Sequence, residues 1–228
     1  MKQRQKALAR LRPQRLFPAL CYLLAVLGWL VGAATAFGGD AAAKANGTLR
    51  EQTLTVADFA LADLTVTGQG AGADGVPYTE LVTASNDPQM ILEDVSGQTV
   101  RSLQMTAGYT GTVREMCLYY TTAPGQDYSQ DRRVFPVRQA DGSYLYTLPR
   151  EHFVSLRLDP CSPEEGKTVT IDVKELRLNR PAAAASYFAP SWYQLFCLAL
   201  YPGLVAAALS WAWCVWQNLY KYRRNEQK

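Results

Sequence analysis

The hydrophobic positions of this chain fall into three regions with different patterns. Residues 16–37 and 192–216 are almost continuously apolar, whereas the stretch between them has short runs in which apolar and polar residues alternate. A helix rises about 1.5 Å per residue, so roughly 20 apolar residues cross a bilayer core. The pattern therefore predicts a transmembrane helix near each end and a β-rich domain between them.

The central region is typical of half-buried strands, because its period is two and Gly, Pro, Asn and Asp separate the runs. Asp141-Gly142 lies between two such runs and predicts a hairpin. Strands are expected at 53–56, 64–66, 90–92, 100–105, 113–120, 144–148, 153–158 and 168–178. Antiparallel strands at this spacing predict an all-β jelly-roll sandwich.

The alternation also predicts which side chains face the core. Leu118 should point inward and Tyr119 outward, because successive side chains of a strand lie on opposite faces. In the last strand the apolar residues are odd-numbered up to Val173 and even-numbered from Leu176. This one-residue shift predicts a β-bulge near positions 174–175.

Charge divides the chain in the same way. Residues 1–15 carry six Lys or Arg and no acid, residues 40–180 carry 13 basic and 19 acidic residues, and residues 221–228 carry four basic and one acidic residue. Short basic flanks stay cytoplasmic, so we expect both termini inside and the central domain outside the cytoplasm. Basic residues confined to the tails favour a membrane partner and argue against nucleic acid. The expected division is a cytoplasmic tail at 1–15, a membrane helix at 16–37, the sandwich at 38–190, a second membrane helix at 191–217 and a second cytoplasmic tail at 218–228.

The first apolar stretch has a second interpretation, a cleaved signal peptide. A basic segment precedes it, and Ala34-Thr35-Ala36 fits a cleavage site. However, the stretch exceeds the usual apolar region of about 7–15 residues, which favours an uncleaved anchor. Both interpretations export the central domain. Neither apolar stretch contains Asp, Glu, Lys, Arg or His, which argues against a channel or pump.

Small residues recur every four positions in both apolar stretches, namely Gly28, Gly32 and Ala36 in the first and Gly203 and Ala207 in the second. Such spacing lets helix backbones approach closely in lipid. It predicts that the two helices pair with each other, that they form a homodimer or that they contact a multipass membrane protein. The alternative is chance, because Gly and Ala are common in membrane segments.

Two of the five cysteines, Cys117 and Cys161, lie in the central region. In an oxidising compartment we expect them to form one disulfide, although two unrelated thiols are the alternative. The other three, Cys21, Cys197 and Cys214, lie in the apolar stretches, where Cys acts as a small apolar residue.

No catalytic motif stands out. The single histidine, His152, begins a strand and has no nucleophile motif nearby, so a surface role is expected. We expect no metal ion, no cofactor and no enzymatic activity. A hydrolase or transferase that uses carboxyl groups stays an alternative, because glycosidase acids have no short signature.

Binding is the better interpretation of the central domain. It is rich in tyrosine, and aromatic faces stack on sugars while Asn, Asp and Gln supply hydrogen bonds. The candidate ligand-binding residues are Tyr119 on the outer face of its strand and Gln126, Asp127 and Tyr128 in the loop that follows. Structural packing is the alternative role for each tyrosine, since tyrosine is common in strands.

Four runs, SNDPQM, REMCLYYTT, VSLRLDP and VTIDVKELRL, lie within residues 80–180. They resemble the galactose-binding-like β-sandwich ectodomains of Gram-positive bacterial envelope proteins linked to surface polysaccharide and glycosyl transfer. The resemblance adds Asn86, Asp87 and Gln89 as candidate binding residues, with a capped turn as their structural alternative. It implies a non-catalytic protein that binds glycan or assists polysaccharide assembly at the cell membrane. The alternative is a protein-interaction subunit of a membrane enzyme or transporter.

Overall fold

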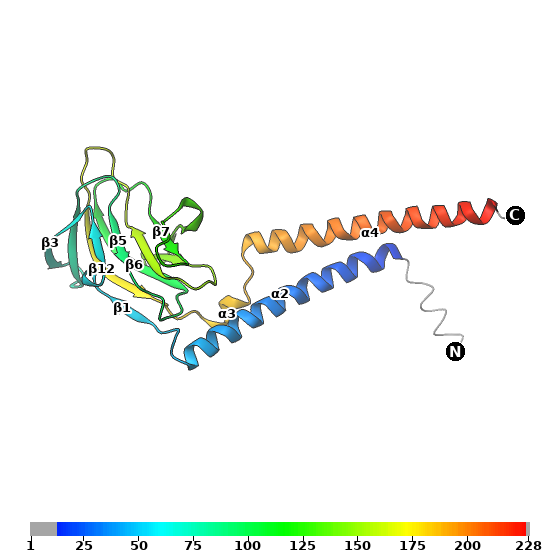
Figure 1. Cartoon of the computed structure of the whole chain (residues 1–228), viewed down its shortest axis with the longest axis horizontal. Helices are drawn as coiled ribbons and strands as arrows, with labels where there is room; N and C mark the ends of the chain where they lie inside the picture. Colours follow the sequence, from blue (N-terminus) through cyan, green and yellow to red (C-terminus); the bar gives the residue numbers. More distant parts are fainter. Residues whose placement is uncertain (1–12, 227–228) are drawn as a thin grey trace. The chain divides into compact units, whose positions relative to one another are not determined.

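A computed structural model describes residues 13–226, which divide into two units. One unit combines the chain up to Gly39 with the chain from Ala183 onward and is helical. The other, Asp40–Ala182, carries the strands (Figure 1). Most of the basic tail predicted at 1–15 lies outside the described residues, as do residues 227–228 of the second tail.

Residues Asp40–Ala182 form two antiparallel sheets. The larger has the order β3-β4-β12-β6-β10-β9 with β1 also paired to β12, and the smaller has the order β2-β5-β11-β7-β8. Apolar side chains from both sheets share one core, so the unit is a β-sandwich. The jelly-roll connection stays a prediction. The strands are β1 Gln52–Leu54, β2 Ala60–Ala62, β3 Leu64–Ala71, β4 Pro77–Thr83, β5 Gln89–Leu92, β6 Ser102–Thr110, β7 Cys117–Thr121, β8 Arg133–Val134, β9 Val137–Arg138, β10 Tyr144–Thr147, β11 Ser155–Asp159 and β12 Thr170–Leu178.

The predicted facing of side chains is confirmed where the alternation is clean. In β7, Leu118 belongs to the core while Tyr119 lies outside the core cluster. The predicted bulge is also confirmed, because the pairing of β12 with β6 shifts between Val173 and Glu175. The shift keeps both halves of β12 in the core, since Val173 and Leu176 are both buried.

The hairpin predicted at Asp141-Gly142 is confirmed and joins β9 to β10. Gly142 has a φ of 83°, a conformation that glycine adopts without steric cost. The Asp141 carboxylate accepts a hydrogen bond from the Ser143 backbone N–H at 3.0 Å. This local chemistry fixes the register of two short strands at the sheet edge.

The helical unit contains α2 (Pro13–Ala45), α3 (Ala184–Tyr187) and α4 (Trp192–Glu226). Both long helices qualify as candidate membrane spans by length and composition, and at most 11% of their most apolar windows is buried. The first helix was expected to end at residue 37, but α2 continues through the alanine-rich residues 41–45. The reason is that alanine is the strongest helix former.

Both ends of the sandwich are fixed by buried polar residues. Asp40 is 3% exposed, and its carboxylate pairs with Arg101 at 3.0 Å and with both terminal nitrogens of Arg150 at 2.8 and 2.7 Å. At the other end Asn179 is also buried; its side-chain oxygen accepts from the Arg101 backbone N–H, and its nitrogen donates to the Thr99 carbonyl oxygen. Residues 99–101 therefore hold both ends of the unit.

The predicted disulfide between Cys117 and Cys161 is wrong, because both are free and buried thiols. Cys117 lies opposite Asp159 in the register of β7 and β11, and its sulfur lies 3.9 Å from the Asp159 carboxylate, outside the core. Cys161 belongs to the core cluster. The smaller sheet therefore separates the two sulfurs. Burial raises the pKa of the Cys117 thiol to about 11 and that of the Cys161 thiol to about 12.

Candidate functional site

Three of the predicted binding residues contact one side chain, Arg157 of β11, and a fourth, Gln89, contacts one of the three. Its guanidinium lies 5.0 Å from the ring centroid of Tyr119 and 5.9 Å from that of Tyr128. It also donates to Asp87 at 2.7 Å, and Gln89 in turn donates to the same Asp87 carboxylate at 2.7 Å. The neighbouring strands β5, β11 and β7 carry Gln89, Arg157 and Tyr119, and the adjoining loops add Asp87 and Tyr128.

The Arg157 surface is rigid and largely closed. Arg157 forms a two-pronged ion pair with Asp159, with both nitrogen–oxygen distances at 2.8 Å. Burial raises the pKa of the Asp159 carboxyl, and the hydrogen bond and charge of Arg157 only partly offset this. Tyr119 is 8% exposed because Arg157 covers its ring. A ligand on this face would therefore meet Arg157 and Tyr128 before Tyr119, so ligand contact by Tyr119 stays a prediction.

The remaining predicted residues lie apart from this surface. The Gln126 side chain accepts from the backbone N–H of Thr122 at 2.8 Å and so closes its own loop. The Asp127 carbonyl oxygen accepts from Arg132 at 2.7 Å. Asn86 lines a separate shallow hollow with the 165–168 turn. The structure therefore does not unite all seven residues.

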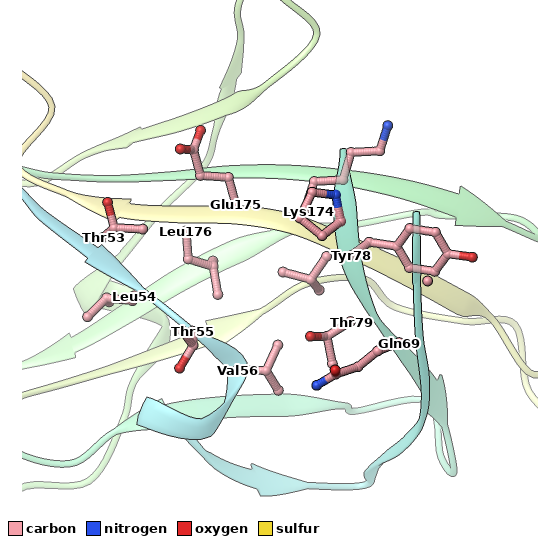
Figure 2. A pocket seen from close by; sticks show the side chains of 13 residues that line it. Thr53, Leu54, Thr55, Val56, Gln69, Tyr78, Thr79, Lys174, Glu175 and Leu176 are labelled. Carbon is pink, nitrogen blue, oxygen red and sulfur yellow. The ribbon is translucent and has the colours of Figure 1, made fainter. Parts of the chain in front are cut away.

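A larger hollow lies in the larger sheet, where β12 changes partner. Residues 170–173 of β12 pair with β4, whereas residues 176–178 pair with β1. The intervening bulge at 174–175 has neither strand beside it, which leaves a groove of about 500 Å³. Figure 2 shows Thr53 of β1 and the following Thr55 on one side of this groove and Thr79 and Gln69 on the other, while the Tyr78 ring points away from it, over Gly70 of β3.

The groove has an apolar floor and polar walls. Its floor consists of core residues that are buried beneath it, namely Leu54, Val56, Val173 and Leu176. Its walls carry hydroxyl groups and an amide, supplied by Thr53, Thr55, Thr79 and Gln69. A concave surface with an apolar base and a few polar groups is the usual form of a small-ligand site.

Thr55 is held in place at the groove by Asp58. The Asp58 carboxylate accepts from the Thr55 backbone N–H at 2.7 Å and from its hydroxyl at 2.9 Å, which caps the short 3₁₀ helix η1 (Val56–Asp58). These hydrogen bonds, the backbone one foremost, hold the pKa of Asp58 below its ordinary value. The cap therefore fixes the backbone of one groove wall.

The two charged residues at the groove are both paired. Lys174 donates to Asp74 at 2.7 Å, and Glu175 accepts from Arg177 at 2.7 Å. The groove therefore offers mainly neutral hydrogen-bonding groups. Within residues 13–226, no cluster of three or more His, Cys, Asp or Glu side chains has metal-binding geometry. His152 lies at the surface, with Nε2 3.0 Å from the Ser96 carbonyl oxygen.

The small residues of the helices fall into two groups. Gly203 of α4 lies close to the Tyr22 hydroxyl, which donates to the Ala199 carbonyl at 2.8 Å. A Cβ at Gly28 or Gly32 would meet nothing within 4 Å. A homodimer or partner at Gly28 and Gly32 stays a prediction, as do roles for Ala36 and Ala207.

Sequence reasoning missed both Arg157 and the groove. Nothing in the sequence near Arg157 shows that three other segments surround its side chain. The sequence did give one indication of the groove. The change from odd- to even-numbered apolar residues predicted the bulge at 174–175, and bulges are frequent beside functional sites. The strands that face this bulge could not be identified from the local sequence.

Comparisons with known proteins give structural likeness only. No family model matches the sequence, and no curated protein matches it. The xylan-binding module CBM86 of Roseburia intestinalis is 14% identical, with 59% of this chain and 98% of that chain covered and a TM-score of 0.36. A β-1,3-glucan-binding CBM6 of Bacillus halodurans is 8% identical (58% and 97% covered, TM-score 0.37), and a CBM35 of Paenibacillus barcinonensis is 11% identical (58% and 99% covered, TM-score 0.35). All three TM-scores lie below 0.5, so these likenesses add nothing to the argument for a ligand or a site.

Proposed function

We propose that this protein is a membrane-anchored, non-catalytic glycan-binding protein. The observation that carries the proposal is the groove beside the β12 bulge. Its volume of about 500 Å³ suits a short stretch of sugar rings, and such sites commonly have volumes of roughly 300–1,000 Å³. The apolar floor offers contact to the apolar face of a sugar, while Thr79 and Gln69 offer hydrogen bonds to its hydroxyl groups.

The membrane anchor rests on the two long helices. Their apolar side chains are exposed along their length; for example, Leu23 is 56% and Trp216 is 66% exposed. A water-soluble protein rarely exposes so much continuous apolar surface, because its removal from water is favourable. The basic tails place both termini in the cytoplasm under this proposal, so the sandwich faces the outside. The groove would then hold glycan beside the membrane, as an accessory component of surface polysaccharide assembly in a bacterial envelope.

A second candidate function is a subunit that binds a larger membrane enzyme or transporter. The observation that favours it is the open face at Gly28 and Gly32, which no atom within the described chain approaches. A partner helix could approach this face closely. Cysteine crosslinking in native membranes tests it: a crosslink from Gly32→Cys to another protein supports the subunit function, and a crosslink to a second copy of this chain supports a homodimer instead.

Glycan binding is tested with the full-length chain in lipid nanodiscs. The protein is applied to an array of polysaccharides and oligosaccharides, and Gln69→Ala and Thr79→Val are compared with the wild type. The matched control is Tyr128→Ala, which changes the Arg157 surface of the other sheet. Loss of binding in Gln69→Ala but not in Tyr128→Ala supports the groove, and the reverse supports the Arg157 surface. If the folded wild-type protein binds no glycan on the array, glycan binding is wrong.

A further inference from the structure

We infer that residues 132–138 of the sandwich, which we call the Arg-Phe segment, are a second membrane contact that binds anionic lipid headgroups. In this contact Phe135 and Val137 insert between the headgroups. The inference goes beyond glycan binding and rests only on the membrane anchor of the proposed function. It follows from the exposed apolar side chains of the segment, from its arginines and from the attachment of the sandwich at both ends.

The Arg-Phe segment crosses one edge of the sandwich. It contains β8, which pairs with β7 in the smaller sheet, and β9, which pairs with β10 in the larger sheet. Each of the two strands has two residues and is the last strand of its sheet. Phe135 and Pro136 join them, so the segment passes from one sheet to the other. Within the described chain, no further strand pairs beyond either of them.

The segment carries the two most exposed large apolar side chains of the sandwich. Val137 is 64% and Phe135 is 52% exposed, and within residues 40–182 the only other exposed ones are Val66 and Val76. The guanidinium of Arg133 lies 4.8 Å from the ring centroid of Phe135. Exposed apolar side chains beside basic ones are typical of segments that lie in the headgroup region of a bilayer.

Two arginines of the segment keep an uncompensated charge. Nine of the 13 basic residues at 40–180 form ion pairs; the four without a described carboxylate partner are Lys44, Arg50, Arg132 and Arg138. Arg132 donates to the neutral carbonyl oxygen of Asp127, and Arg138 is exposed. Arg133 is paired with Glu115. The segment therefore offers two guanidinium groups to an anion, and phosphate is a group that guanidinium binds well.

The apolar pair and the attachment of the sandwich favour lipid over a soluble anion. A soluble polyanion could bind the arginines but has no apolar region for Phe135 and Val137, whereas a bilayer has both. The unit Asp40–Ala182 is joined at each end to a candidate membrane span, so the segment stays near the bilayer and a weak contact suffices. Residues 40–180 carry 19 acidic and 13 basic residues, so an anionic bilayer repels the sandwich as a whole and attracts this segment.

The experiment places the photocrosslinking residue p-benzoylphenylalanine at position 135 of the full-length protein. The protein is illuminated in nanodiscs of phosphatidylglycerol or of phosphatidylcholine, and lipid adducts are measured by mass spectrometry. The matched control has the same residue in place of Val76, which is also exposed but lies in the turn between β3 and β4. In phosphatidylglycerol, Arg138→Gln should lower the adduct yield at position 135 up to about fivefold, the effect of one basic residue near an anionic surface. Arg50→Gln removes another exposed cation without an ion pair and should leave this yield unchanged.

The outcomes separate this inference from the proposed function. More lipid adducts at position 135 than at position 76, in phosphatidylglycerol only and with fewer in Arg138→Gln, support the inference. Equal yields at the two positions, equal yields in the two lipids or no adducts at all overturn it. Adducts to a second copy of the chain overturn it in favour of a homodimer. A chain that stays in solution without nanodiscs overturns the membrane anchor itself, whereas glycan binding is decided by the array alone.

Discussion

Removal of the Asp40 carboxylate should strongly destabilise the sandwich. Asp40 is 3% exposed and forms hydrogen bonds with Arg101 and Arg150 at 2.7 to 3.0 Å. Removal of one partner of a buried ion pair costs about 3–5 kcal/mol, since the remaining charge loses its compensation. The Arg101 and Arg150 side chains are 24% and 41% exposed and keep part of their hydration, so we expect the lower end for Asp40→Ala, about 3 kcal/mol. Asp40→Asn keeps the shape but exchanges charge-assisted for neutral hydrogen bonds, so it should cost about half as much.

The buried thiols provide an assay that reports on the sandwich alone. Cys117 and Cys161 are buried within it, whereas every tryptophan lies outside residues 40–182 and would report on the helices. Alkylation of these two thiols in full-length protein across a urea series, read by peptide mass spectrometry, gives the unfolding midpoint. A loss of about 3 kcal/mol lowers that midpoint by roughly 1.5 M at a typical urea dependence of about 2 kcal/mol per M.

The control for this experiment is an ion pair at the surface. Glu115 is 50% exposed and pairs with Arg133 at 3.0 Å, so Glu115→Ala should cost less than about 1 kcal/mol. A midpoint for Asp40→Ala that equals that of Glu115→Ala would refute the reasoning, because a buried and an exposed carboxylate would then contribute equally.

Three further predictions concern groups in the sandwich. Without reductant, Cys117 and Cys161 should resist alkylation in the native protein and both react after unfolding; a failure to react after unfolding would show a disulfide. Tyr146→Phe should raise the free energy of unfolding by about 1 kcal/mol in the thiol assay, because the Tyr146 hydroxyl is buried with no hydrogen-bond partner among the described protein groups. A lower free energy of unfolding would show that the hydroxyl does form a hydrogen bond. Hydrogen bonds from Thr55 lower the pKa of the folded Asp58 below its ordinary value of 3.8. The Asp58 carboxylate therefore contributes to stability above pH 3.8, and this contribution is lost as the pH falls through the pKa of the folded state. The stability gap between wild type and Asp58→Asn, measured by near-ultraviolet circular dichroism, should therefore stay constant from about pH 5 to about pH 8 and shrink below 3.8; a gap that widens in acid would contradict this.

The strands that the sequence predicts well are those whose apolar residues alternate cleanly. β7 and β12 were expected close to their observed positions. The bulge in β12 was predicted from the change from odd- to even-numbered apolar residues alone. β4 was missed because its inward positions include Thr79 and Thr83 beside Leu81, so hydrophobicity does not alternate along it. Threonine at inward positions therefore gives a strand without the apolar–polar alternation from which strands are predicted.

The disulfide prediction failed for a related reason. The alternation of β7 places Cys117 outward with Tyr119, and this was visible in the sequence. The inward position of Cys161 depends on the turn after β11, where alternation ends. Arg157 shows the same limit, because its charge predicts exposure while its partners come from segments up to 70 residues away. Local patterns predict the facing of a side chain, but the neighbours that surround it depend on the sheet order.

The clasp formed by residues 99–101 has a mechanical consequence. The Arg101 side chain binds Asp40 where the chain enters the sandwich, and the backbone of Arg101 and Thr99 binds Asn179 where the chain leaves it. A pulling force between the two ends would therefore act first on these hydrogen bonds and on those from Arg150 to Asp40. If both ends are embedded in a fluctuating bilayer, the clasp keeps tension from the membrane away from the core and from the groove.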